Sequence, residues 1–439
     1  MSLRPRLAAL RAAGSILLLV GPAPLQAQEW SLADAVRDAL ARHPAVEGAR
    51  AAEDAASARV GGARAAFLPS LTASGSAIRF EEPMVVAPLH GFDPTRPPTF
   101  DDALVRSQVA LGYTLFDGGG RSAGLSAARS ARAAATAGLA SSEAQVIEAT
   151  AQAWLGVVTA EAVLEASDRR RTALEAEVTR ARRLLEAGSA PQVELLRAQA
   201  EAAQAEADHA SAVAALAAAR SILTRLTGRD VPDGLTAPRA ATLSSDASSA
   251  SAPPELVAAR ASADAADARA RGARAAFLPR VALASSVDQY GATGRRFTNE
   301  WQAGLQVSLP LFLGGARFAE VRQRSAEARQ AHADADRLAL DLATARDRIA
   351  SGVAEAEGRV AALESAEAQF TEVARVEALA LAEGAGVQRD LLAAEAQLFR
   401  VRADLARARA ALLTQWIALA RADGRLDRAW VDAHLEGAR

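Results

Sequence analysis

Apolar residues follow a helical period over long stretches of the chain. Residues 120–187 contain no proline and keep this pattern throughout, and a further helix is predicted over about 192–226. At about 1.5 Å per residue, the first stretch alone would form a rod roughly 100 Å long. The last predicted helix carries an apolar seam with steps of three and four residues, as in a coiled coil: Leu391, Ala394, Leu398, Val401, Leu405, Ala408 and Leu412. The pattern therefore predicts long, paired helices.

Four shorter segments alternate with a period of two, which predicts β-strands with one apolar and one polar face. They span residues 70–77, 105–115, 281–288 and 301–309. Residues 81–103, between the first two, are rich in proline and glycine and are predicted to form a long loop. Membrane-spanning β-strands need about 9–11 residues, which these segments approach. A soluble hairpin packed on a core has the same pattern, so both interpretations stay open at this point.

An octapeptide that occurs twice indicates that the chain is a tandem duplication. The sequence Gly-Ala-Arg-Ala-Ala-Phe-Leu-Pro occupies residues 62–69 and 272–279, at an offset of 210 residues (272 − 62). The later strand ends, at Phe116 and Phe312, repeat at an offset of 196 (312 − 116). The first copy therefore holds 14 extra residues (210 − 196) between its octapeptide and Phe116. Such a repeat determines the architecture, because each copy forms the same unit.

The duplication and the N-terminal pattern together predict the organisation of the chain. Arginines at positions 4, 6 and 11 precede the short apolar run 16–20 and a small residue at position 27, which is typical of a secretory signal peptide. The predicted parts are a signal peptide (1–27), repeat 1 (28–228, with a β-hairpin at 68–116 and a tip turn at 188–191), a linker (229–254), repeat 2 (255–424, with a β-hairpin at 278–312 and a tip turn at 384–387) and a C-terminal tail (425–439).

Composition narrows the class of protein. Half of the residues are hydrophobic but only 4% are aromatic, and the abundance of alanine favours thin, closely apposed helices. The formal net charge of −2 gives no reason to expect nucleic-acid binding. The chain has no cysteine, which excludes disulfides, thiolate metal sites and a lipid-modified N-terminal cysteine. The five histidines lack ligand spacing, so we predict no catalytic, cofactor or metal site and no enzyme activity.

The strand count implies an oligomer if the strands enter a membrane. The smallest spanning barrels have about eight strands, so four strands cannot close one. A dimer, a trimer or a larger ring would be needed, with the polar strand face lining a water-filled lumen and the helices extending the ring as a tube. Two other classes remain open: a secreted structural coiled-coil protein with soluble hairpins, and a periplasmic adaptor subunit.

The duplicated order of elements resembles the TolC-like outer-membrane efflux protein family over nearly all of the chain after the signal peptide. The motifs that carry the resemblance are Phe67-Leu-Pro69, Phe277-Leu-Pro279, the strand exit 309–315, and the stretch from Gly384 to Leu392. The resemblance implies an α+β membrane protein with coiled-coil hairpins in a periplasmic barrel. It also implies a homotrimer whose twelve strands form a β-barrel in outer-membrane lipid. We expect a passive exit duct of an efflux or secretion system that docks to a periplasmic adaptor and an inner-membrane transporter; the pattern does not identify the cargo.

The resemblance also implies candidate residues at the periplasmic entrance. Family members carry acidic residues six positions after each tip glycine, and Glu194 and Asp390 occupy those positions here. In a trimer they would place carboxylates around one axis, where a ring of like charge attracts cations. The alternative is an acid in the first turn of a helix, which the helix macrodipole favours. Leu381, Gly386 and Ala393 stand where well-known members have a tyrosine, an arginine and an aspartate, so the polar lock of those members is not reproduced.

Two further groups of candidate residues complete the prediction. The resemblance implies that the adaptor docks at the helical tips, so we expect contacts from the tip residues, whose small side chains allow close helix approach: Gly188, Ser189, Ala190, Gly384, Ala385 and Gly386. Tyr290, Phe297 and Trp301 lie near predicted strand ends, where aromatic residues of membrane interfaces belong.

Overall fold

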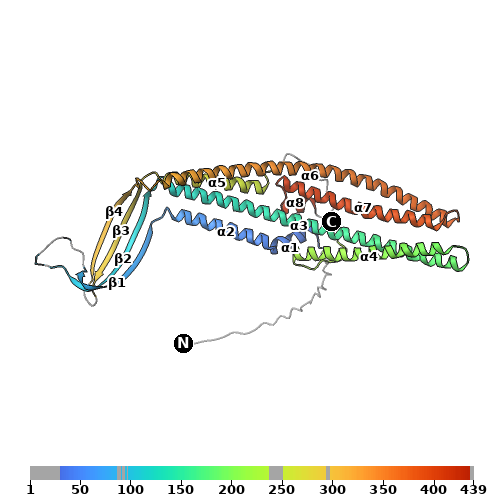
Figure 1. Cartoon of the computed structure of the whole chain (residues 1–439), viewed down its shortest axis with the longest axis horizontal. Coiled ribbons are helices and arrows are strands. Elements are labelled where there is room, and N and C mark those ends of the chain that lie inside the picture. The colour runs from blue at the N-terminus through green and yellow to red at the C-terminus, as the bar shows by residue number, and fades with distance from the viewer. Residues whose placement is uncertain are drawn as a thin grey trace, which may run out of the picture.

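The chain forms an elongated body with its strands at one end and two helical hairpin tips at the other (Figure 1). A computed structural model describes residues 30–86, 90, 94–95, 97–236, 251–292 and 297–435, without the side chain of Gln388. The predicted signal peptide lies outside these residues. The elements are α1 (Leu32–Arg42), α2 (Pro44–Ala65), β1 (Ser70–Val85), β2 (Phe100–Phe116), α3 (Gly120–Glu186), α4 (Gln192–Thr227), α5 (Pro254–Ala275), β3 (Arg280–Gly291), β4 (Thr298–Ser308), α6 (Ala316–Ala382), α7 (Gln388–Ala422) and α8 (Arg428–His434).

Local sequence signals set the helix ends. Ser31 caps α1 through a capping box, in which its hydroxyl accepts from the backbone N–H of Asp34 and the Asp34 carboxylate accepts from the Ser31 backbone N–H. His43 separates α1 from α2 and caps α2, whose first residue is Pro44. The two long helices α3 and α6 each span 67 residues, and each begins directly after a glycine pair. The prediction of long helices is therefore confirmed.

The four strands form one antiparallel sheet in the order β1-β2-β3-β4. Ser70 lies opposite Gly112 in the first hairpin, and Arg280 lies opposite Ser308 in the second. These two pairs are related by the offsets of 210 and 196 that the sequence shows, so both copies fold their hairpins in one register. Strands β2 and β3 then join the copies edge to edge.

The insertion in the first copy differs from its predicted form. The sequence pattern predicts a loop over 81–103, whereas β1 continues to Val85 and β2 begins at Phe100. The strands β1 and β2 have 16 and 17 residues, against 12 and 11 in β3 and β4, so most of the insertion lengthens the hairpin. Pro83 is tolerated inside β1 because this strand lies at the sheet edge and its register shifts between Arg79 and Met84.

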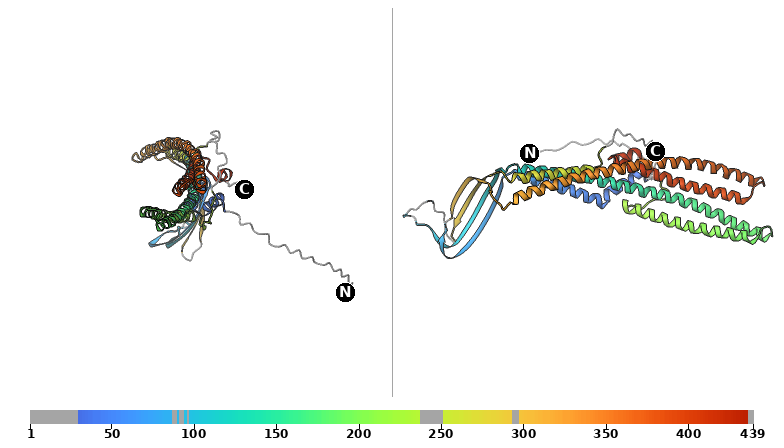
Figure 2. Two further views of the ribbon diagram at one scale, coloured as in Figure 1. Left: turned by 90° about the vertical axis from the view of Figure 1, so that its right-hand side faces the viewer. Right: turned by 45° about the horizontal axis from the view of Figure 1, so that its top comes forward.

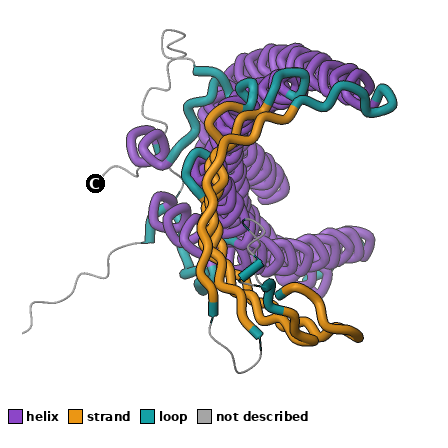
Figure 3. Tube along the Cα trace, turned by 90° about the vertical axis from the view of Figure 1, so that its left-hand side faces the viewer, coloured by secondary structure: helices purple, strands orange, loops and turns teal. Residues whose placement is uncertain are grey.

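Seen along its length, the body is a curved layer rather than a solid rod. The helices form an arc that is open on one side (Figure 2), and the sheet curves in the same sense in front of them (Figure 3). Helix α3 packs against α2, α4, α5 and α7, while α6 packs against α5 and α7. The predicted seam of α7 is buried over most of its length, including Leu398 and Leu405. The two long edges of this curved layer are not covered by other described elements of the chain.

The main apolar core lies midway along the body, where α1, α3, α4, α7 and α8 meet. The Trp30 and Trp154 rings lie 5.3 Å apart, and the Trp154 indole N–H donates to the Thr236 carbonyl at 3.1 Å. The sequence pattern predicts a short polar tail over 425–439, but Arg428–His434 form α8, and Trp430 is buried in this core. The described residues 425–435 are thus part of the fold, because Trp430, Val431 and Leu435 complete the core.

The joint between β2 and α3 generates a prediction about Gly118. Its backbone has φ of +66°, and a Cβ there would lie 2.6 Å from the Leu278 Cβ and 2.7 Å from the Ala275 carbonyl oxygen. Gly118→Ala should therefore lower the free energy of unfolding by about 2–4 kcal/mol, from a left-handed backbone and overpacking. Thermal unfolding followed by circular dichroism measures this. Gly124→Ala, in the open interior of α3, is the control and should be neutral or stabilising; equal effects would contradict the prediction.

Candidate functional site

The two faces of the sheet differ in chemistry along complete rows of paired residues. One row runs Ala73, Val109, Val287 and Trp301 across all four strands, and the next row on the other face runs Ser74, Gln108, Asp288 and Glu300. Opposed residues share a face of a pleated sheet, so each row belongs wholly to one side. The sheet therefore presents one apolar face and one polar face, which is the arrangement of a barrel with a wet interior.

An ion pair on the polar face joins the two copies. The Arg106 guanidinium donates to the Asp288 carboxylate at 2.7 Å, and this side chain is only 2% exposed. The Ser286 hydroxyl donates to the same carboxylate at 2.7 Å, and the Gln302 amide donates to Ser286 at 3.1 Å. The Arg106 guanidinium also lies 5.1 Å from the centre of the Tyr290 ring. The β2–β3 register thus leaves the buried carboxylate of Asp288 paired and hydrogen-bonded on several sides, as a buried charge requires.

The predicted interface aromatics do not share one environment. Trp301 is 75% exposed and stands in the apolar row. Phe297 precedes β4 and packs against Gly291, where a Cβ would lie 2.6 Å from its ring. Tyr290 lies on the polar face, opposite Arg106. Trp301 is therefore the one of the three that stands in a strand row of the apolar face, and Tyr290 lies beside the polar network; whether the three aromatics mark a membrane interface stays a prediction.

The joint between helix and strand carries an arginine that sequence inspection missed. The Arg121 guanidinium stacks 5.0 Å from the centre of the Phe67 ring and donates to the carbonyls of Ala66 at 3.3 Å and Leu115 at 3.4 Å. It thus fastens the end of one helix to the end of one strand, and it satisfies carbonyls that neither element can pair. The second copy repeats this clamp with Arg317, Phe277, Ala276 and Pro310. The recurring arginine after each glycine run was the signal that could have revealed it.

The helical tips close with the same backbone bonds in both copies. In the first, the Ser189 N–H donates to the Leu184 carbonyl at 2.8 Å; in the second, the Ala385 N–H donates to the Ala380 carbonyl at 2.9 Å. The second turn is tighter, since the Gly386 N–H also donates to Ala380, and a Cβ at Gly386 would lie 2.9 Å from the Leu381 nitrogen. Packing therefore requires glycine at position 386, because a side chain there would collide with the backbone of Ala380 and Leu381.

The two predicted acids lie in the first turns of α4 and α7 but in different surroundings. Glu194 lines a groove of about 280 Å³ between the α3–α4 hairpin and α7, together with Arg389 and Phe399. The Asp390 carboxylate instead accepts from the Arg389 side chain next to it at 3.3 Å. Within one protomer the structure does not bring these two acids into contact. A ring would need further copies of the chain, and it remains a proposal.

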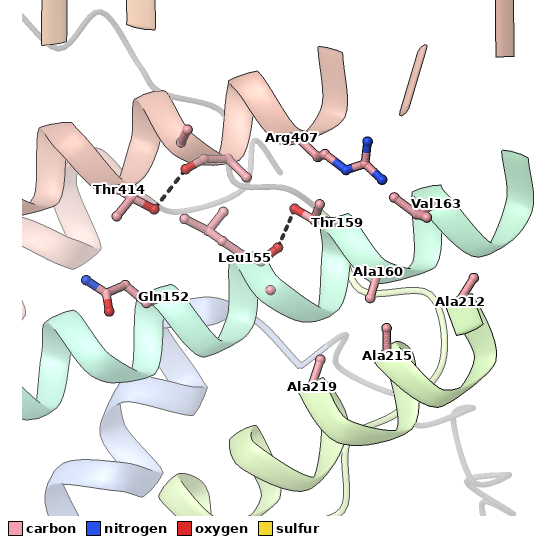
Figure 4. A pocket seen from close by; sticks show the side chains of 13 residues that line it. Gln152, Leu155, Thr159, Ala160, Val163, Ala212, Ala215, Ala219, Arg407 and Thr414 are labelled. Atoms are coloured by element: carbon pink, nitrogen blue, oxygen red, sulfur yellow. Dashed lines mark hydrogen bonds between the residues drawn. The ribbon is translucent and has the colours of Figure 1, made fainter. Parts of the chain in front are cut away.

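A second groove, midway along the body, offers no chemistry of its own (Figure 4). It has a volume of about 470 Å³ between α3, α4 and α7, and small side chains such as Ala160 and Ala215 line much of it. The hydroxyls of Thr159 and Thr414 donate to carbonyls of their own helices, at 2.7 and 2.9 Å. Its polar groups are therefore occupied, and the groove is a packing feature of the helix layer.

Charged side chains also tie the two copies together near the middle of the body. Arg421 of α7 donates to Glu148 of α3 and to Glu255 of α5, both at 2.8 Å. Burial of the Glu255 carboxylate opposes its ionisation, but the hydrogen bond and the charge of Arg421 outweigh burial, so the pKa of Glu255 lies below its ordinary value. These charges pair helices that lie far apart in the sequence, and the duplication alone does not indicate them.

No group of three or more His, Asp or Glu side chains that could hold a metal ion occurs among the described residues. The histidines take part in separate contacts, such as His332 with Asp267 at 2.9 Å and His90 with Glu300 at 3.1 Å. In the described part of the chain, no helix combines the length and the apolar character needed to span a membrane.

Comparisons with known proteins agree with this architecture. The family model for outer membrane efflux proteins matches residues 35–229 and 248–425, one segment in each copy. The alkaline protease secretion protein AprF of Pseudomonas aeruginosa is 27% identical over 180 residues, which cover 40% of this chain and 37% of AprF, so the match spans less than two thirds of that relative.

Solved structures of outer-membrane channels have the same fold. The outer membrane protein VceC of Vibrio cholerae superposes with a TM-score of 0.75 at 19% identity, covering 90% of this chain and 96% of VceC. The CmeC outer membrane channel of Campylobacter jejuni has a TM-score of 0.74 at 16% identity, covering 97% and 95%. At these identities the likeness establishes the fold, in which helical hairpins extend from a four-stranded sheet.

The Arg421 cluster leads to a prediction for pH dependence. A carboxylate with a lowered pKa adds stability that is present above its unfolded pKa, about 4.5, and is lost as the pH falls through its folded pKa. Glu255→Gln should therefore destabilise the protein by about 1–2 kcal/mol near pH 7, and the difference from the parent should shrink below about pH 4. Denaturant unfolding at several pH values measures this. Glu357→Gln, an exposed acid on α6, is the control; a pH-independent difference would refute the assignment.

Proposed function

The chain belongs to the outer membrane efflux protein family, and on that premise we propose that it forms an outer-membrane exit duct of a tripartite efflux or type I secretion system. Three copies join their sheets into a twelve-stranded barrel in the outer membrane, and their helices continue as a tunnel into the periplasm. The duct is passive. A periplasmic adaptor and an inner-membrane transporter deliver the cargo, and the transporter supplies the energy.

One observation carries this proposal: a two-faced sheet runs directly into helices of 67 residues within a single curved layer. At about 1.5 Å per residue these helices reach roughly 100 Å, several times the thickness of a bilayer. The clamps at Arg121 and Arg317 join the end of a helix to the end of a strand in both copies. A sheet that closes into a ring therefore continues into a tube of helices.

The rival interpretations account for less of the molecule. A soluble coiled-coil protein would have no use for an apolar sheet face on which Trp301 and Leu305 stand largely exposed. A periplasmic adaptor with a single helical hairpin would not need two near-equal copies that pair through their strands.

Two classes of cargo follow from the relatives. The family description points to efflux, and the name of AprF points to export of a protease. Deleting the gene and comparing both drug susceptibility and the set of exported proteins separates the two, because each class changes only one readout.

Cell fractionation tests the duct itself. We expect the protein in the outer-membrane fraction, with a band on a gel that moves when the sample is heated, since barrels keep their structure in cold detergent. A protein recovered wholly in the soluble fraction as a monomer would overturn the proposal.

The helical tips make up the proposed periplasmic end. Glu194 and Asp390 form the acidic entrance, and the turns at 188–190 and 384–386 contact the adaptor. Their small residues and the close packing of Gly386 against the Leu381 backbone support this role. Trp301 and Phe297 mark the membrane interface at the opposite end, because both are exposed and lie beside the apolar strand face.

The acidic entrance can be tested by conductance in planar bilayers. Glu194→Gln with Asp390→Asn removes the negative ring, and loss of about 1 kcal/mol of cation attraction should lower the cation-over-anion permeability ratio about fivefold. The single variants show which acid lies nearer the axis. Glu372→Gln, an exposed acid on α6 that pairs with Arg375 on the same helix, is the matched control. Unchanged selectivity in the double variant would remove the ring.

A further inference from the structure

A third groove, on the surface of the helix layer near the sheet, gathers three arginines that have no partner. It has a volume of about 830 Å³ and lies over α3, between α2 on one side and the start of α5 on the other. Arg64 of α2 and Arg129 and Arg132 of α3 line it. Within the described part of the chain, none of these three side chains makes a hydrogen bond or an ion pair, and all three residues are exposed.

The directions of the two helices make these side chains converge. Helix α2 runs toward the sheet and α3 runs away from it. Side chains tilt toward the N-terminus of their helix, so Arg129 and Arg132 tilt toward the sheet and Arg64 tilts away from it. Glu53 lines the far part of the groove and accepts from the Thr136 hydroxyl at 2.9 Å. Arg64 therefore stands level with about residue 125 of α3 (64 − 53 = 11 and 136 − 11 = 125). The three guanidinium groups thus share a level about 10 Å below the start of α3.

The charge of this stretch is unbalanced in the first copy only. From Gly120 to Ser142, α3 carries three arginines and no acidic residue. The repeat equivalents of Arg129 and Arg132 are Ser325 and Ala328 (129 + 196 and 132 + 196), and Ala328 is buried. Gathered positive charges repel one another, and an anion relieves this repulsion. Guanidinium groups bind phosphate oxygens with two parallel hydrogen bonds, so a phosphate group suits the groove.

The groove faces away from the concave side of the layer. Its far end is lined by Ser251 and Gly424, and α8 begins shortly after Gly424. Helix α8 lies on the outer side of the arc (Figure 2). The stripe of α3 that lines the groove continues at helical spacing to Ile147 and Trp154, which pack in the core that α8 completes. Since α2 and α5 flank α3 within one chain, the groove is formed by a single protomer and opens outward.

The apolar face of the sheet has a polar limit at the end away from the helices. Ser107, Gln289 and Asn299 lie opposite one another there. Their row is the next one on the same face after the row of Val287 and Trp301, because two residues separate the rows along each strand. The apolar band therefore starts at the Trp301 row and runs toward the helices.

The height of this band sets the level of the lipid headgroups. From Val287 to Val281 it covers six residue steps (287 − 281), which is about 20 Å along the strand and roughly 15 Å in height at a tilt of about 40°. A barrel carries an apolar band about 25 Å tall, so the band continues roughly 10 Å beyond the strand ends. Leu278 and Phe318 stand there, 49% and 62% exposed. The headgroup layer thus begins at the level of the three guanidinium groups.

We propose that this groove binds the phosphate headgroup of an anionic phospholipid from the periplasmic leaflet of the outer membrane. Arg64, Arg129 and Arg132 hold the phosphate, and the acyl chains of the lipid extend along the apolar face of the sheet. Each chain has one such site, because the second copy lacks two of the three arginines. This inference rests on the proposed outer-membrane duct and adds a lipid site to its outer surface.

Lipid binding by the full-length protein in a neutral detergent tests the site. The probe is phosphatidylglycerol with a fluorescent acyl chain, compared with phosphatidylcholine that carries the same chain. Arg129→Gln with Arg132→Gln should weaken binding of phosphatidylglycerol about 25-fold, since each arginine near an anionic headgroup contributes about fivefold. Binding of phosphatidylcholine should not change. Arg129→Lys with Arg132→Lys should retain most of the affinity, because lysine also binds phosphate, as a point charge.

Arg182→Gln with Arg183→Gln is the matched control. Both arginines are exposed residues of the same helix, and their loss removes the same charge about 80 Å farther along α3. This variant should bind both lipids as the parent does. Circular dichroism and elution volume should be unchanged in all variants, because none of the replaced side chains has a partner within the described residues.

Four results would overturn the lipid site. They are equal affinity of the parent for the two lipids, equal loss in the control variant, affinity for inorganic phosphate equal to that for phosphatidylglycerol, and sedimentation with peptidoglycan that the glutamine variant loses while its lipid binding is unchanged. Each of these leaves the duct standing if the protein stays in the outer-membrane fraction. A soluble monomer would overturn both proposals.

Discussion

Backbone pairing at the edges of the sheet is the constraint on which the rest of this structure depends. In hydrocarbon, each unpaired N–H or C=O group costs several kcal/mol, so a spanning sheet must have no free edge. The chain supplies four strands with β1 and β4 at the edges, and four strands do not close. A sheet of this kind would therefore have to assemble with further copies before it could span a membrane, and its curvature, which follows that of the helix layer, is the shape of a segment of a ring.

The duplication supplies all four strands from one repeated unit. One unit of helix, strand, strand and helix pair is used twice, and the two hairpins keep the same register despite an identical run of only eight residues at their start. Arg121 and Arg317 hold the change from helix to strand in each copy. The copies diverge at one pair: Arg106 of β2 and Asp288 of β3 form an ion pair, whereas the repeat-equivalent positions hold Gln302 and Ile78. The duplication thus gives both hairpins one register, and the divergence gives the β2–β3 junction its own charged contact.

The two copies differ from each other at both ends of the body. At the strand end, the first hairpin is extended by the insertion, and the side chain of His90, in the connection that follows β1, reaches Glu300 of β4. At the helical end, the second turn is tightened by Gly386, where the first has Ala190. Among the described residues, the largest cluster of buried apolar side chains lies between these two ends, where Trp154 and Trp430 are buried. The long helices depend on this middle region and on their alanine-rich mutual contacts.

The sequence by itself determined the long helices, the four strands, the duplication and the likeness to outer-membrane channels, because helical and strand periodicities and turn residues act over a few positions. Ser31, Pro44 and the seam of α7 behave as local rules require. Only the tertiary structure decided that residues 81–85 extend a strand, that Trp430 enters the core, and that Tyr290 faces Arg106. Those outcomes depend on partners such as Asp288, which is 182 residues from Arg106. Such pairs are selected by the register of whole strands, and no local pattern encodes that choice.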